Sequence, residues 1–159
     1  MKDILRQLLS LILPITVLII VPTLIERHAV LALGFPLAAG LVVMLIGLLI
    51  MAQTILSFIR MGKGTLAPWS PTRKLIIGGM YAYVRNPMIL GVILVLTGES
   101  IAISSRSILL WAVLVFFINT AYFIFSEEPG LEKRFGAEYL EYKYNVPRWV
   151  PRLKPWKPV

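Results

Sequence analysis

The residues best suited to chemistry lie in two polar segments of an otherwise apolar chain. The first, residues 78–91, reads GGMYAYVRNPMILG, and the second begins at Glu127 with EEPGLEKRFGAEY. Arginine and glutamate bind groups of opposite charge through charge-assisted hydrogen bonds, and tyrosine rings pack against flat rings. The chain has no cysteine, which excludes disulfides, thiolate nucleophiles and cysteine metal ligands. The two segments therefore favour the binding of a charged small molecule, with no metal ligand set in view.

The composition places the chain in a membrane. Its 159 residues are 58% hydrophobic and 15% charged, whereas a soluble domain has about 25% charged and about 45–50% apolar residues. This balance excludes an ordinary soluble globule, a disordered chain and a secreted disulfide scaffold. We therefore expect an integral membrane protein whose helices position the two polar segments.

Stretches without charge predict four membrane-spanning helices, over residues 7–25, 36–59, 87–103 and 107–126. The first is about 28 Å long as an α-helix, close to the ~30 Å hydrocarbon core of a bilayer. Glu99 interrupts the third stretch. Only three residues separate the last two, so they should form a tight antiparallel hairpin. In the second helix, Gly40 and Gly47 share one face and predict a close helix contact.

The predicted fold is all-α, with one integral membrane domain over residues 1–159. It has four transmembrane helices and a cytoplasmic amphipathic C-terminal helix. That last helix is predicted from the helical spacing of its apolar residues, which are Leu131, Phe135, Tyr139 and Tyr142. Asn86 and Pro87 suit the N-cap and first position of the third transmembrane helix.

The basic residues predict the orientation in the membrane. Fourteen of the sixteen Lys and Arg residues fall in the N-terminal tail, the 60–87 loop and the C-terminal tail. Arg27 and Arg106, in the two opposite loops, are the others. By the positive-inside rule, both termini and the 60–87 loop are cytoplasmic. The net charge of +8 thus reflects orientation and contact with membrane lipids, and we expect no nucleic-acid partner. The small size favours a bacterial or archaeal inner membrane.

This topology brings the polar segments together. Residues 73–87 lead into the third helix, and residues 127–152 leave the fourth. Because these two helices form a hairpin, both segments must lie at the same cytoplasmic face. We expect one pocket there that combines aromatic rings, an arginine and two carboxylates.

Both motifs resemble those of the isoprenylcysteine carboxyl methyltransferase and phospholipid methyltransferase superfamily. The first reads YxYVRNPMxxG from Tyr81, and the second reads EEPxLxxRFGxEYxxYxxxVPR from Glu127. The resemblance covers residues 73–151 and depends on both motifs flanking a hydrophobic hairpin. It implies a membrane methyltransferase that uses S-adenosylmethionine and acts on a lipophilic or lipid-linked acceptor.

The resemblance also implies roles for particular residues. Arg85 and Glu128 are expected to be catalytic, as partners of the cofactor's carboxylate and ammonium groups. The expected cofactor-binding residues are Tyr81, Tyr83, Val84, Arg85, Asn86, Pro87, Gly91, Glu127 and Glu128. Arg134, Tyr139 and Arg148 are expected to contact the acceptor. Asn86 departs from the histidine of the best-studied members, and since asparagine does not titrate, we expect it to bind without acid or base chemistry.

The sequence leaves open whether the acceptor's reactive group is a carboxylate or an amine. A carboxylate acceptor is already ionised and needs a nearby cation. An amine acceptor must lose a proton, which a carboxylate of the protein could take. Two other functions are compatible with the sequence, namely a small transporter that uses Glu99 and a non-catalytic membrane subunit with the same fold.

Overall fold

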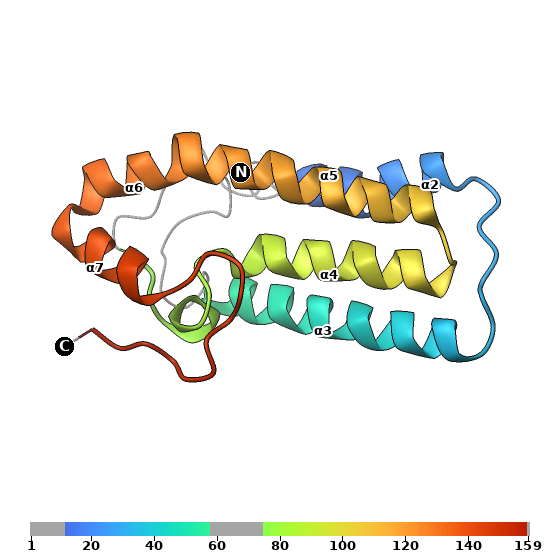
Figure 1. The fold of residues 1–159 in the computed structure, drawn as a ribbon, viewed down its shortest axis with the longest axis horizontal. Helices are drawn as coiled ribbons and strands as arrows, with labels where there is room; N and C mark the ends of the chain where they lie inside the picture. Colours follow the sequence, from blue (N-terminus) through green and yellow to red (C-terminus); the bar gives the residue numbers. More distant parts are fainter. Residues whose placement is uncertain (1–11, 58–74, 159) are drawn as a thin grey trace, which may run out of the picture.

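A computed structural model describes residues 12–57 and 75–158, and these residues form helices and connecting loops (Figure 1). The elements are η1 (Thr16–Ile20), α2 (Val21–Ile25), α3 (Phe35–Ser57), η3 (Gly79–Ala82), α4 (Pro87–Ala102), α5 (Arg106–Tyr122), η4 (Phe123–Glu127), α6 (Glu128–Phe135) and α7 (Ala137–Asn145). Figure 1 shows α3 and α4 side by side, with α5 running along α4 on the side away from α3 and continuing into α6 beyond their ends. The prediction of an all-α fold is confirmed for the described residues.

Two helices in the described part of the chain are long and apolar enough to cross a membrane. These are α3 and the continuous helix Arg106–Phe135, which joins α5, η4 and α6. Two shorter apolar helices cover Ile12–Ile25 and Pro87–Ala102. Many large apolar side chains of α3 and α5 are exposed, including Leu45, Leu110 and Phe117, as expected for helices that contact lipid. Of the predicted spans, residues 7–11 and 58–59 lie outside the described residues, and four membrane crossings stay a prediction.

Glycines allow α3 and α4 to pack with their backbones in contact. A Cβ atom built on Gly40 would lie 2.5 Å from the carbonyl oxygen of Gly98, and one on Gly91 would lie 2.8 Å from that of Gly47. No side chain fits at these distances, so the close approach requires glycine at each position. The predicted contact face of Gly40 and Gly47 is confirmed. Gly91, expected to bind a cofactor, packs against Met51 and Gly47 of α3, and its part in binding stays a prediction.

Each of the two π-turns in the described residues ends two residues before a proline. In η1, the N–H of Val21 bonds to Thr16, and the next residue, Pro22, has no N–H to donate. The carbonyl of Val17 therefore has no donor in its own helix. The indole of Trp111 on α5 donates a 3.0 Å hydrogen bond to it. A proline in the first helix thus leaves a backbone carbonyl without its helical donor, and this carbonyl accepts a hydrogen bond from α5.

This link predicts a coupled effect of two substitutions. Replacing Trp111 by phenylalanine should lower the free energy of unfolding by about 1 kcal/mol, because the Val17 carbonyl loses its partner. In a Pro22→Ala background the restored N–H can bond within the helix, so the Trp111→Phe cost should shrink. Thermal unfolding of the four proteins in detergent measures this double-mutant cycle. Equal costs in both backgrounds would contradict the link.

The C-terminal region differs from the single amphipathic helix that the sequence predicts. The structure has two helices, α6 and α7, which meet at Gly136 with φ +53°. This left-handed conformation suits glycine and ends α6. The chain reversal buries Tyr139, Tyr142 and Val146 together, with Leu131 and Phe135 packed against them. The predicted apolar residues thus share one cluster across two helices.

Candidate functional site

Backbone hydrogen bonds hold the loop before α4 against the C-terminal tail, defined here as residues 146–158. The N–H of Arg85 donates to Pro147, and those of Arg152 and Trp156 donate to Tyr83 and Ala82, each at 2.9 Å. The phenol of Tyr142 in α7 donates a 2.8 Å bond to the Tyr81 carbonyl. The two segments that the sequence predicts to meet are therefore joined along their length.

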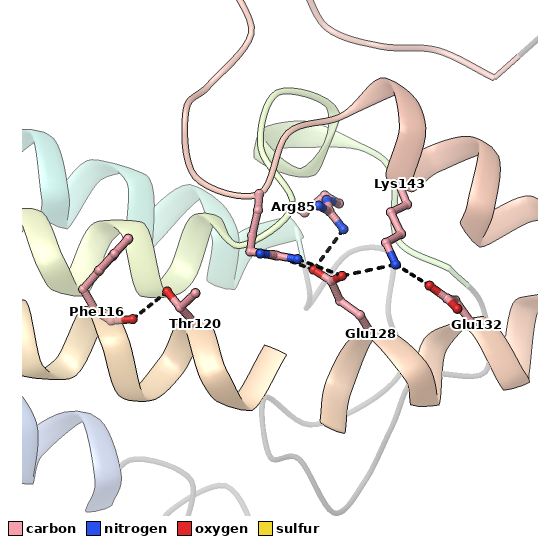
Figure 2. A network of polar contacts seen from close by, with 7 residues as sticks. Arg85, Phe116, Thr120, Glu128, Glu132 and Lys143 are labelled. Atoms are coloured by element: carbon pink, nitrogen blue, oxygen red, sulfur yellow. Dashed lines mark hydrogen bonds and ion pairs between the residues drawn. The ribbon is translucent and has the colours of Figure 1, made fainter. Parts of the chain in front are cut away.

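Glu128, which is itself buried, lies at the centre of a network of cations (Figure 2). Its Oε1 accepts hydrogen bonds from Arg85 Nη1 at 3.0 Å and from Arg148 Nε at 2.7 Å. Its Oε2 accepts a 3.0 Å bond from Arg148 Nη2, and Lys143 Nζ lies 3.4 Å away. Only 7% of the Glu128 side chain and 10% of the Arg85 side chain are exposed. One carboxylate thus organises basic residues from the loop, α7 and the tail.

The environment keeps Glu128 ionised. Burial alone would raise the pKa of its carboxyl, but hydrogen bonds from Arg148 and the charges of Arg85, Arg148 and Lys143 outweigh that effect, and the pKa lies below its usual value. Lys143 also pairs with Glu132, and that hydrogen bond raises the pKa of the lysine. With three cations and two carboxylates, the network carries one surplus positive charge.

Among the described residues, two buried side-chain donors near this network have no hydrogen-bond partner. They are Nε of Arg85 and Nε1 of Trp149. The Trp149 ring packs against Phe116 and Phe123 of α5, with centroids 5.0 and 5.7 Å apart. A buried donor without an acceptor is costly, so such atoms commonly mark where a ligand or water binds. A surplus positive charge and a vacant Arg85 donor together fit the carboxylate of a small molecule.

Glu127 has a different environment from its neighbour. It is half-buried, and no hydrogen bond or ion pair joins its side chain to a described residue. Burial and the charge of Glu128 raise the pKa of Glu127 to about 7, although Arg134 acts in the opposite direction. Glu127 follows the apolar stretch that ends at Ser126. Two adjacent carboxyl groups therefore differ, one fixed as a carboxylate and one able to exchange a proton near neutral pH.

The π-turn η4 ends at the first of these carboxylates, Glu127. Within it, the N–H of Glu128 bonds to the Phe123 carbonyl, and the following Pro129 has no N–H. Proline would clash with the carbonyl four residues earlier in a regular helix, and the wider turn accommodates it. This is the same local arrangement as at Pro22. The proline thus shapes the segment that carries both glutamates.

A cavity of about 380 Å³ lies beside the joined segments. The loop and the C-terminal tail supply its walls, which are Ile77, Gly78, Gly79, Ala82, Tyr83, Pro155, Trp156, Lys157 and Pro158. Tyr83 is the only cavity residue among those expected to bind a cofactor. The end of the tail was not expected in the site, because its prolines and tryptophans fit an interfacial tail with aromatic anchors.

The structure separates the expected site residues into groups. Arg85, Glu128, Tyr139 and Arg148 lie together, and the charge of Glu128 helps burial to raise the pKa of Tyr139 to about 12. Arg148, expected to contact an acceptor, pairs with Glu128. Lys143, which carries part of this network, was not expected.

The other expected residues lie around this centre. Val84 and Pro87 are fully buried, so their side chains support the loop. Asn86 occupies the predicted N-cap of α4, but its side chain makes no capping bond and bonds to no described residue. The guanidinium of Arg134 lies 5.5 Å from the ring centre of Phe135. Glu99 lies near the far end of α4 and pairs with no described residue, Arg106 included.

Comparisons with known proteins add one finding. A family model described as phospholipid methyltransferase matches residues 35–138. The match runs from α3 to the start of α7, so it includes Arg85 and Glu128 and ends before Lys143 and Arg148. Neither the comparison with curated proteins nor that with solved structures gave a match.

Proposed function

Because the chain belongs to the phospholipid methyltransferase family, we propose that it transfers a methyl group from S-adenosylmethionine to a lipophilic or lipid-linked acceptor. The observation that carries the proposal is the buried ion pair of Arg85 with Glu128, 3.0 Å apart. The two residues come from separate polar segments that flank the α4–α5 hairpin. A buried donor without a partner and an uncompensated positive charge both cost stability, so their presence beside this ion pair favours a binding site over a purely structural contact.

The site offers groups that match both ends of the cofactor. S-adenosylmethionine supplies a methyl group on a positively charged sulfur, an electrophile that needs no metal for activation. Arg85, with its vacant Nε, would bind the cofactor's carboxylate. Glu128 would hold Arg85 and Arg148 in place and supply the negative charge nearest to the ammonium group. Tyr83 would pack against the adenine, and the free amide of Asn86 would donate a hydrogen bond.

The protein's part in catalysis is to orient the reactants and exclude water. Methyl transfer is an in-line displacement, so the acceptor must lie in line with the bond that breaks. The C-terminal tail, bonded to the loop through Arg85, Tyr83 and Ala82, covers this part of the molecule. Water excluded from such a site cannot compete with the acceptor or weaken the ion pairs.

The membrane explains how the acceptor arrives. We propose that four helices cross the bilayer with both termini cytoplasmic, following the positive-inside distribution of the basic residues. The Glu128 network then lies at the cytoplasmic ends of α4 and α5. A lipophilic acceptor would enter sideways between helices with its reactive group at this boundary, and we propose that Arg134 and Tyr139 contact it.

Binding of the cofactor is the direct test. Isothermal titration of the detergent-solubilised protein with S-adenosylmethionine should give saturable binding, and Arg85→Ala should weaken it at least tenfold, since about 1.4 kcal/mol is lost with one charge-assisted bond. Glu99→Gln, at the far end of α4, is the matched control and should bind as the wild type does. Absence of saturable binding would refute the proposal that the protein is a methyltransferase. A tenfold loss in Glu99→Gln with Arg85→Ala unaffected would favour a transporter.

A further inference from the structure

The C-terminal tail turns back from α7 towards the apolar helices (Figure 1). Within it, the Trp149 ring packs against Phe116 of α5 and Phe123 of η4, with ring centres 5.0 and 5.7 Å apart. Phe116 precedes Ser126, where the uncharged stretch ends, by ten residues, which is about 15 Å along a helix. The tail therefore runs beside the apolar part of this helix, and we expect the residues after Trp149 at the boundary between bilayer and water.

Hydrogen bonds fix which residues of the tail point inward. The N–H of Arg152 donates to the Tyr83 carbonyl, and its Nη1 donates a 2.7 Å bond to the carbonyl of Asn145. The N–H of Trp156 donates to Ala82. These bonds hold the tail on the loop before α4 and on α7, and they leave other side chains of the tail on its outer side.

The outer side of the tail combines apolar and basic side chains. Leu153 is 100% exposed and Val150 is 74% exposed. Lys154 and Lys157 are exposed as well, and neither pairs with a described residue. Residues 146–158 contain four basic residues and no acidic one. We call Val150, Leu153, Lys154 and Lys157 the tail surface.

We propose that the tail surface docks on the anionic lipids of the cytoplasmic leaflet, and that this contact holds the tail on the loop before α4. The apolar side chains would enter the upper part of the acyl layer, and the lysines would bind lipid phosphate oxygens. A stable protein partner needs about 800 Å² of surface on each side, far more than four side chains of one extended segment supply. The proposal goes beyond methyl transfer and requires only that the tail is cytoplasmic.

Docking would also keep one wall of the cavity in place. Lys157 lines this cavity together with Trp156 and Tyr83, and the tail is bonded to the loop through Arg152 and Trp156. A basic residue near an anionic leaflet strengthens binding about fivefold, and salt screens this attraction. In neutral lipid or at high salt, the tail should therefore leave the loop more often.

The absence of cysteine from the chain permits a probe at a single site. Leu153→Cys, labelled with an environment-sensitive fluorophore, is reconstituted in phosphatidylcholine vesicles or in an equal mixture with phosphatidylglycerol. Lipids spin-labelled near the headgroup should quench the label in the mixture, and a label at Glu141→Cys, on the exposed side of α7, should not be quenched. Lys154→Gln and Lys157→Gln should each lower the ratio of docked to undocked label about fivefold, whereas Lys133→Gln, which removes an exposed lysine of α6, should not.

Hydrogen exchange in the unlabelled chain gives a second readout. The amides of Arg152 and Trp156 bond to the loop, so their exchange reports how often the tail detaches. Both should exchange more slowly in the mixed vesicles than in phosphatidylcholine alone. This protection should disappear when Lys154→Gln and Lys157→Gln are combined, and also at high salt.

The outcomes identify what covers the tail surface. Equal quenching in neutral and mixed vesicles would overturn the recognition of anionic lipid. A label shielded only at high protein density, without quenching by lipid, would mean that a second copy of the chain covers Leu153. Exchange that is the same in both lipids would overturn the claim that the leaflet holds the tail. Because neither readout uses S-adenosylmethionine, failure here leaves the proposed methyltransferase unaffected.

Discussion

Replacing Glu128 by alanine should abolish measurable binding of S-adenosylmethionine and lower the free energy of unfolding by about 3–5 kcal/mol. Removing one partner of a buried ion pair costs this much because the other charge is left without compensation. Here two arginines lose their shared acceptor, and only 10% of the Arg85 side chain is exposed to water. Arg85 would no longer be held where its vacant Nε can bind a carboxylate.

The measurement combines titration calorimetry with thermal unfolding in the same detergent. Glu141→Ala, which removes an exposed carboxylate from α7, is the control and should change neither quantity. Arg148→Lys keeps the charge but not the two-point contact, so it should lose less affinity than Glu128→Ala. Near-normal affinity in a folded Glu128→Ala protein would show that this network has no part in binding.

The pH dependence of this network has a definite sign. Since the pKa of Glu128 is lowered on folding, its contribution to stability is full at neutral pH, above the unfolded value of 4.5, and is lost as pH falls through the folded value. The raised pKa of Glu127, one residue away, predicts the reverse trend.

Replacing Gly98 by valine should prevent α3 and α4 from packing. A Cβ atom at Gly98 would lie 2.6 Å from both the carbonyl oxygen of Gly40 and the backbone nitrogen of Met44. Backbone atoms cannot move aside as a side chain can, so the two helices would have to separate. Overpacking of a core typically costs about 1–3 kcal/mol, and a clash with backbone on a helix-length interface should exceed that range.

Size-exclusion chromatography in detergent measures the outcome, as loss of the monodisperse peak and of thermal stability. Gly130→Ala is the matched control, because a Cβ atom at Gly130 in α6 would meet nothing within 4 Å. It should leave the stability unchanged or raise it slightly, since alanine favours a helix over glycine. A well-folded Gly98→Val protein would mean that α3 and α4 are not held at backbone contact.

The sequence predicts best those features that depend on single residue types and their periodicity. Uncharged stretches predicted the positions of the helices, and the spacing of Gly40 and Gly47 predicted a contact face. Asn86 and Pro87 predicted where α4 begins, and the helix does begin at Pro87. That two polar segments meet followed from the short connection between α4 and α5.

Features that depend on three-dimensional arrangement were less accessible. The prediction of a single C-terminal helix was wrong. The apolar residues keep a helical spacing through Gly136, but the positive φ of this glycine ends α6 and starts a second helix. That Arg148 would share Glu128 with Arg85 could not be inferred, since the path of the C-terminal tail depends on backbone bonds to the loop. Only the family resemblance placed Glu128 ahead of Glu127, because the two are the same residue type side by side and their spacing does not distinguish them.

The difference between the two glutamates follows from helical phase. A regular α-helix rotates by about 100° per residue, and a π-turn contains one residue more than the turn it replaces. Beyond η4, every residue is therefore set back by one position, and Glu128 takes the angle that Glu127 would have in an unbroken helix. By favouring the π-turn, Pro129 thus determines which side of the helix each glutamate faces. In relatives, a gain of one residue before this proline would bring the first glutamate to the angle that Glu128 has here, while leaving both carboxylates in the sequence.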